Sequence, residues 1–261
     1  MAEISFPDVT LLITHYNRSG SLKRLLSTFQ DLGVQFADIV VSDDGSKAEH
    51  QDKLLELQSV FNYRLVTAER NRGLGNNINK GQDAVQTPYT LYVQEDFVPK
   101  ESFTRHFTDA LAILKSEGSI DIIRFYAYFK YPYTKPYNKG FSEMLFSPMP
   151  WYSDHLKFYL YSDHPHLRRS DFFDKFGRYP EGLKGDVTEF TMCLSFLKRK
   201  ARGLLFDNFT EVFDQRNSED EPSTMDRGSW KQKESLLISI LRQVYLRYRF
   251  AKNTLQYLFF K

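Results

Sequence analysis

The first 125 residues alternate short apolar runs with segments of helical spacing, and this rhythm constrains the fold more than any other feature of the chain. A nearly continuous apolar run such as 9–14 is typical of a strand that is covered on both faces. Strands and helices that alternate in this way predict an α/β fold with right-handed βαβ units and a mostly parallel central sheet flanked by helices. The apolar runs lie at 9–14, 38–42, 63–67, 88–93 and 120–125, and helical spacing occurs at 21–32, 48–60 and 103–116.

The alternation of apolar runs and helical spacing ends after residue 125. The stretch 126–165 is dense in Tyr, Phe, Pro and Lys and has few periodic segments, which indicates long loops with room for antiparallel strands. Helical spacing returns at 186–199, an apolar run follows at 204–206, and residues 214–229 are polar. We therefore predict one domain over 1–230, in which residues 126–230 form a less regular second half.

The tail, residues 231–261, differs from the rest of the chain. It carries seven Lys or Arg and one Glu, a net charge of +6 within a protein whose total is +2. Its apolar residues recur at helical spacing along one stripe, which predicts a basic amphipathic helix. Such a helix suits an anionic membrane surface, but it equally suits packing on the domain or on a second subunit in a homodimer. The sequence leaves both alternatives open.

The composition excludes several classes of protein. A dedicated nucleic-acid binder would be strongly basic, whereas the net charge here is +2, so we expect no nucleic-acid partner. Cys193 is the single cysteine, so an intramolecular disulfide cannot form, which fits a reducing cytosol. The first residues lack the pattern of a signal peptide, and there is no apolar run of about 18 residues that would span a membrane. We expect a cytoplasmic protein, or one at the cytoplasmic face of a membrane.

Polar clusters follow the strands that this pattern predicts. Open α/β sheets bind their ligands in the crevice at the carboxyl ends of the strands. Asp43 and Asp44 could there accept hydrogen bonds from a ribose or a base, or bind a cation through oxygen, although alone they would suit an ordinary solvated turn. Four clusters at the same edge favour a binding site. They are Thr14-His15-Tyr16-Asn17, Ser42-Asp43-Asp44-Gly45-Ser46, Asn71-Arg72-Gly73-Leu74-Gly75 and Gln94-Glu95-Asp96.

In order and spacing, these motifs resemble the inverting family 2 glycosyltransferases of the GT-A fold, whose central sheet is Rossmann-like. The resemblance covers about residues 7–125 well and 160–210 weakly. It implies that 1–125 binds a nucleotide-diphosphate sugar, with a UDP-type donor favoured, and that 126–230 binds the acceptor. The donor residues that it implies are Thr14, Tyr16, Asn17, Asp43, Asp44, Asn71, Gly73, Asn79 and Glu95.

The resemblance also implies a divalent cation, Mn²⁺ or Mg²⁺, on the donor diphosphate. The acidic D-x-D motif of the family matches Gln94 and Asp96, so Asp96 is the metal ligand that we expect. Gln94 departs from the pattern because it offers only a neutral carbonyl oxygen. The chain also departs from the family at Ile78, where many members have an arginine between Ala and Asn.

An inverting transfer needs a general base that takes the proton of the acceptor hydroxyl. The family places this acid at the start of the helix that follows the acceptor loops, which implies Glu189, with Asp186 as the alternative. We expect sugar transfer to a hydroxyl of a glycan or a lipid-linked glycan, in the biosynthesis of a cell-surface polysaccharide. Two other readings remain: a catalytically inactive GT-A protein that binds nucleotide or glycan, and, more weakly, nucleotidyl transfer.

Overall fold

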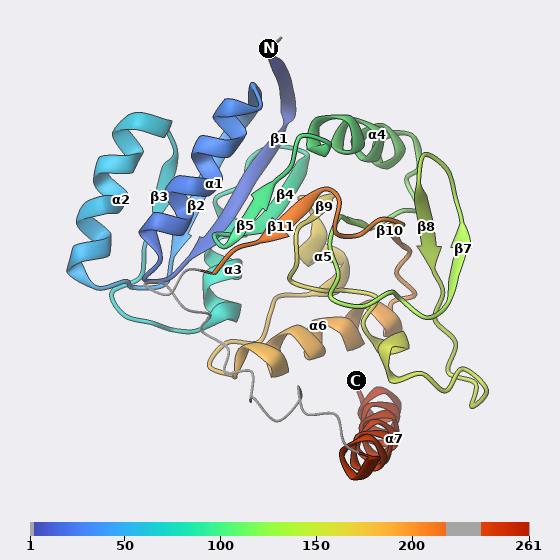
Figure 1. Ribbon diagram of the computed structural model, residues 1–261. Helices are drawn as coiled ribbons and strands as arrows, with labels where there is room; N and C mark the ends of the chain where they lie inside the picture. The colour runs from blue at the N-terminus through green and yellow to red at the C-terminus, as the bar shows by residue number, and fades with distance from the viewer. Residues whose placement is uncertain (1–2, 218–235, 261) are drawn as a thin grey trace.

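A computed structural model describes residues 3–217 and 236–260 (Figure 1). Its centre is a nine-stranded sheet with the order β3-β2-β1-β4-β9-β6-β10-β8-β7. Within it β9 and β8 run against the other strands, so the predicted mostly parallel sheet is confirmed. The strands are β1 (Ile4–His15), β2 (Val34–Asp43), β3 (Arg64–Val66), β4 (Tyr89–Gln94), β6 (Ile122–Arg124), β7 (Thr134–Pro136), β8 (Phe141–Met144), β9 (His166–Arg169) and β10 (Gly203–Phe206).

Helices cover both faces of this sheet because successive strand residues point to opposite sides. In β1, Leu11 and Ile13 belong to the core beneath α1 (Ser19–Asp31), α2 (Ala48–Phe61) and α4 (Phe103–Ser116). Leu12 belongs to the second core, beneath the helices of the other face. Those helices are α3 (Leu74–Asp83), α5 (Phe172–Phe176) and α6 (Gly185–Lys198).

The stretch 126–165 contains the antiparallel pair β7–β8 and a single 3-10 turn, η1 (His155–Phe158). The sequence did not indicate β9, which lies between β4 and β6 and pairs antiparallel with both. It also did not indicate the small second sheet, in which β5 (Phe97–Pro99) pairs with β11 (Phe213–Gln215). These strands are three or four residues long, so too few positions exist for a periodic pattern. The polar stretch predicted beyond 217 lies outside the described residues.

The predicted C-terminal helix is present as α7 (Leu236–Phe259). It lies against η1 and α6 at the bottom of Figure 1. The Tyr257 ring packs on Phe146 at a centroid distance of 5.0 Å, and Asn253 is buried. Among the described residues, no helix combines the length and the apolar character needed to cross a bilayer.

Candidate active site

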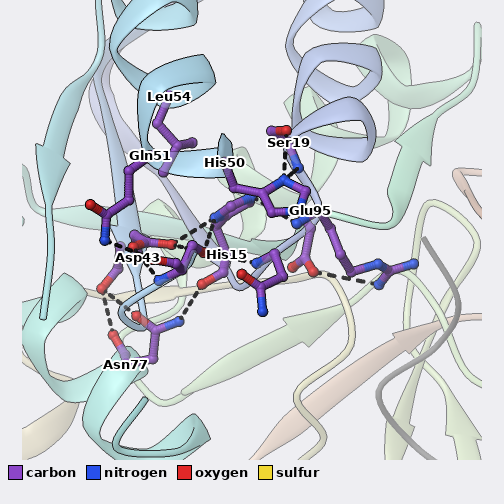
Figure 2. A network of polar contacts seen from close by, with 12 residues as sticks. His15, Ser19, Asp43, His50, Gln51, Leu54, Asn77 and Glu95 are labelled. Atoms are coloured by element: carbon purple, nitrogen blue, oxygen red, sulfur yellow. Dashed lines mark hydrogen bonds and ion pairs between the residues drawn. The ribbon is translucent and has the colours of Figure 1, made fainter. Parts of the chain in front are cut away.

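The carboxyl ends of β1 and β2 are joined by a network of buried hydrogen bonds around Asp43 (Figure 2). The Arg18 backbone N–H donates to His15 Nε2 at 3.2 Å, so Nδ1 carries the proton and donates to Asp43 Oδ1 at 2.8 Å. Ser46 donates to the same carboxylate through its backbone N–H and its hydroxyl. Burial raises the pKa of Asp43, but the hydrogen bonds from His15 and Ser46 outweigh it and hold the pKa below its ordinary value. Asp43 is therefore an ionised anchor of the turn.

Asp44 connects this turn to the loop that precedes α3. Its Oδ1 accepts the Arg72 N–H and its Oδ2 accepts the Gly73 N–H, both at 2.9 Å. Gly73 has φ +87°, a conformation that glycine adopts readily, and this lets both N–H groups face one carboxylate. Lys80 completes the corner, because its Nζ donates to the carbonyls of Asp43 and Val66 at 2.6 and 2.8 Å. Burial lowers the pKa of Lys80 to about 8.

Arg18 connects the end of β1 to the acidic residues after β4. Its NH1 lies 3.4 Å from Glu95 Oε1 and 3.2 Å from Asp96 Oδ2, and all three side chains are almost fully buried. Gln215 on β11 donates to Asp96 Oδ2 at 2.8 Å. Burial, together with the nearby charge of Asp96, raises the pKa of Glu95 to about 8. Three segments that are far apart in the sequence thus meet around Asp96.

Glu189, in the second turn of α6, points to the segment that leads into β9. Its Oε1 accepts the Ser162 hydroxyl at 2.9 Å and the Asp163 N–H at 3.1 Å. Asp163 is buried and its Oδ1 accepts the Tyr161 hydroxyl at 2.5 Å. Burial first, and then the charge of Glu189, raise the pKa of Asp163 to about 8. Because β9 pairs antiparallel with β4, this carboxyl pair lies at the sheet edge where β4 ends.

The remaining donor residues expected from the sequence lie in different settings. Asn17, with φ +52°, joins the edge network, because its N–H donates to Ser46 Oγ and its Oδ1 accepts the Lys47 N–H. Thr14 is buried against the Tyr92 hydroxyl, and Tyr16 is half-buried. Asn71 Oδ1 accepts the Gly73 N–H and so shapes the loop.

Two expected site residues lie apart from the edge network. The side chain of Asn79 is buried and binds the main chain of Tyr179 and the carboxylate of Glu181. Asp186 is exposed, and its Oδ1 accepts the N–H of the next residue, Val187. The structure therefore brings Glu189, and not Asp186, next to the buried polar groups of the site.

Sequence reasoning missed four residues of this site: His15, Arg18, Lys80 and Asp163. His15 falls inside the first motif and Arg18 directly follows it, so their polar character was visible but their partners were not. Lys80 has the spacing of a solvent-facing helix residue. Asp163 sits between Ser162 and His164 in a stretch with no periodic pattern. Their roles depend on contacts across the fold, which a single sequence does not display.

The residues around Asp96 fit a divalent cation only as a partial ligand set. Among the described residues no group of three or more His, Cys, Asp or Glu side chains could hold a metal alone. Asp96 Oδ1, however, is buried with no hydrogen-bond partner in the described part of the chain. Mg²⁺ and similar cations are commonly held by one or two carboxylates together with substrate phosphates. Asp96, with Glu95 beside it, fits that arrangement when a diphosphate supplies the other oxygens.

In a comparison with protein-family models, residues 10–177 match the model "Glycosyl transferase family 2". The match spans β1 to α5 and contains every strand-end cluster described above. A comparison with curated protein sequences finds no match.

Solved structures share the fold at low sequence identity. S. aureus TarS 1–349 in complex with UDP-GlcNAc matches with a TM-score of 0.58 and 15% identity, over 84% of this chain and 62% of that one. The same protein without a named ligand gives a TM-score of 0.59 and 14% identity, over 97% and 72%. The mannosyltransferase PcManGT from Pyrobaculum calidifontis, with GDP-Man and Mn²⁺, gives 0.50 and 12%, over 75% and 53%. The chain thus spans less than two thirds of the first of these structures, and the likeness establishes a shared GT-A fold.

Proposed function

The chain belongs to glycosyl transferase family 2, and from this premise we propose that it transfers a sugar, with inversion, from a nucleotide-diphosphate donor to a hydroxyl of a glycan or glycolipid. The observation that carries the proposal is the meeting of four strand-end clusters at one edge of the sheet. They provide anchored carboxylates at Asp43 and Asp44, a glycine loop at Gly73, and the acidic pair of Glu95 and Asp96.

The proposed binding site for the sugar donor lies at this edge of the sheet. Asp44 holds the loop 71–73 next to the turn 43–46, which gives the nucleoside a preformed pocket wall. The anchored Asp43 leaves the rim residues Tyr16 and Asn17 to contact base and ribose. A UDP-type donor is favoured, because TarS is described with UDP-GlcNAc and with UDP.

The chemical step would use residues from both parts of the fold. Asp96 and Glu95 would hold a divalent cation, which when bound neutralises the charge that develops on the diphosphate leaving group. Both hydrogen bonds that Glu189 makes with described residues use Oε1. Its Oε2 would accept the proton of the acceptor hydroxyl as the hydroxyl oxygen attacks the anomeric carbon. Ser162 and the Asp163 N–H would orient the carboxylate for that transfer.

Nucleotide binding tests the donor site directly. UDP, GDP and dTDP are compared by thermal unfolding, each with and without Mn²⁺. A ligand at a hundred times its Kd stabilises a protein by about 2.7 kcal/mol, so we expect UDP with Mn²⁺ to raise the Tm by several degrees. Asp96→Asn should remove the part of the rise that needs Mn²⁺. A melting temperature that no nucleotide changes would refute the donor site.

The general base has its own test. Glu189→Gln keeps the shape and the Oε1 contacts but cannot take a proton, so we expect transfer to fall by about 10²–10⁴-fold with UDP binding unchanged. Asp186→Asn, at the exposed acid of the first turn of the same helix, is the matched control and should keep its activity. Full activity of Glu189→Gln, or loss of activity in Asp186→Asn, would reassign the base.

The alternative, an inactive protein that binds nucleotide or glycan, is favoured by one contact. The Arg18 guanidinium lies against both acids that would hold the cation, and so could replace its charge. If UDP binds equally with and without Mn²⁺, and no donor is hydrolysed or transferred, this alternative holds. Arg18→Gln tests the role of the guanidinium itself, because Asp96 and Glu95 should bind Mn²⁺ more tightly without the competing cation.

The acceptor and the location follow from the same chemistry. We infer a glycan or lipid-linked glycan acceptor of a cell-surface polysaccharide, bound by the less regular half of the fold. A lipid-linked acceptor would bring the protein to the cytoplasmic face of a membrane, through the tail 231–261.

A further inference from the structure

The helix α7 packs on the domain through a single face. The rings of Phe250 and Tyr257 lie 6.3 Å from the ring of Phe158 on η1. Arg249 donates to the Tyr159 hydroxyl at 2.6 Å, and Asn253 is 4% exposed. Residues 249, 250, 253 and 257 follow helical spacing, so they belong to one side of the helix. That side is the contact with the domain.

The opposite face of α7 is apolar and exposed. At 100° per residue, Tyr248 lies about 160° around the helix from Phe250. The apolar stripe that the sequence predicts is therefore the side that the domain does not cover. Seven large apolar side chains on this side are between 49% and 79% exposed: Leu241, Val244, Tyr245, Tyr248, Leu255, Leu258 and Phe259.

The charge of α7 favours an anionic occupant for this face. Leu236–Phe259 contains no acidic residue, and of its four basic residues Arg249 is bound to Tyr159 on the domain side, whereas Arg247 and Lys252 are exposed. Two copies of this helix that paired through their apolar faces would bring like charges together, which opposes self-association. An anionic lipid surface attracts the same charges, by about fivefold in binding for each Lys or Arg that lies close to it.

A loop close to α7 also carries exposed apolar side chains. Met149 and Trp151 are 47% and 71% exposed. The buried Lys157 fixes this loop beside α7, because its Nζ donates to the carbonyls of Ser147 and Met149 and lies 5.0 Å from the centroid of the Phe250 ring. Tryptophan is enriched where membrane proteins meet the headgroup region. A second, independent segment thus presents membrane-seeking side chains next to the helix.

We propose that the outer face of α7, together with Met149 and Trp151, docks on an anionic phospholipid bilayer with the helix lying in the headgroup plane. This inference rests on the membrane location proposed above and specifies the surface that makes the contact. In Figure 1, β1 runs from the N-terminus toward the side of the molecule on which α7 lies. Docking through α7 therefore turns the carboxyl ends of the strands, where the candidate site lies, toward the bilayer.

The test is sedimentation of the full chain with vesicles of phosphatidylcholine, with and without phosphatidylglycerol. We expect binding to the anionic vesicles that weakens with salt. The double variant Tyr248→Ser and Leu255→Ser should bind at least tenfold more weakly. The matched control is Leu55→Ser with Val60→Ser on α2, where the two side chains are 59% and 67% exposed, and it should bind like wild type. Both variants should keep the wild-type Tm and UDP binding.

Three results would overturn the proposal: wild-type protein that stays in solution with anionic vesicles, a double variant that binds like wild type, or a control that loses binding equally. Analytical ultracentrifugation tests whether the exposed face of α7 instead binds a second copy of the chain. A wild-type dimer that Tyr248→Ser with Leu255→Ser converts to a monomer would assign the face to a second copy of the chain. The UDP-induced rise in Tm is measured separately, so a failed donor site and a failed membrane surface give different results.

Discussion

At the scale of single residues, the proton on Asp163 makes folding depend on pH. Burial and the charge of Glu189 raise the pKa of Asp163 to about 8, whereas in the unfolded chain the carboxyl has a pKa of about 4. Between these values the folded chain holds one more proton than the unfolded chain. The contribution of this proton to the free energy of unfolding is therefore fully present below the pKa of the unfolded chain. It is lost as the pH rises through the pKa of the folded chain, by about 1.4 kcal/mol per pH unit.

Asp163→Asn keeps the shape of the side chain and removes this proton difference. We expect the unfolding free energy, measured with urea between about pH 5 and 7, to fall less steeply with pH than in wild type, by up to about 1.4 kcal/mol per unit. Glu95→Gln should flatten the slope in the same way, because burial raises the pKa of Glu95 to about 8 as well. A variant at Asp163 with the slope of wild type would mean that the residue is ionised in the folded chain.

At the scale of elements, the packing of α3 on the sheet fixes the loop that Asp44 holds. A Cβ added at Gly81 would lie 2.6 Å from Leu12 Cδ1 and 2.9 Å from Ser42 Cβ, both on the central strands. Gly81→Ala gains about 1 kcal/mol of helix propensity but must push α3 away from β1 and β2. We expect a net loss of about 1–3 kcal/mol in urea unfolding, and weaker UDP binding because the loop 71–73 moves with the helix.

Gly118→Ala is the control for this substitution. Its added Cβ would meet nothing within 4 Å, so the reduced entropy of the unfolded chain should leave stability unchanged or raise it by up to about 1 kcal/mol. Equal effects of the two substitutions would show that close packing of α3 does not set the position of the loop.

The elements that could be predicted from the sequence are those whose own residues form an apolar run or an apolar helical stripe. The apolar run of β1 and the stripe Leu22, Leu25 and Phe29 of α1 are buried as expected, because burial on both faces of a sheet selects such residues along the chain. β9 could not be predicted in this way, because its sequence is His-Leu-Arg-Arg. The buried Arg168 is stabilised by contacts across the fold, among them hydrogen bonds that Gln82 and Tyr179 accept. Partners 86 and 11 positions away do not appear in a local pattern.

In the candidate site, too, some features could be predicted from the sequence and others could not. Asp43, Asp44 and Asp96 could be located because strand ends in an α/β sheet meet at one edge. What each carboxylate does there depends on the donors around it. The His15 and Ser46 donors hold Asp43 ionised, and two backbone N–H groups occupy Asp44, whereas Asp96 keeps one buried oxygen without a partner in the described residues. Those distinctions are properties of packing and could not be predicted from residue type.

At the scale of the whole molecule, one sheet joins the two halves that the sequence suggested. β9, from the second half, is inserted between β4 and β6 of the first, so that β4 and β6 do not pair with each other. The core beneath α3 likewise combines Leu12 and Ile78 with Tyr161 and Phe196. A fragment of residues 1–125 would therefore lose β9, one of the two neighbours of β4, and most of the residues of the second core.

We expect that fragment, expressed alone, to lack a cooperative thermal transition and to bind no UDP, although it contains all the proposed donor residues. Exposed strand edges and apolar surface of this kind also favour aggregation, so circular dichroism and ultracentrifugation should accompany the binding measurement. The full chain, prepared in parallel, is the control and should melt in one transition that UDP shifts upward. A 1–125 fragment that melts cooperatively and binds UDP would show that the donor half folds on its own, and that β9 completes the sheet without being required for it.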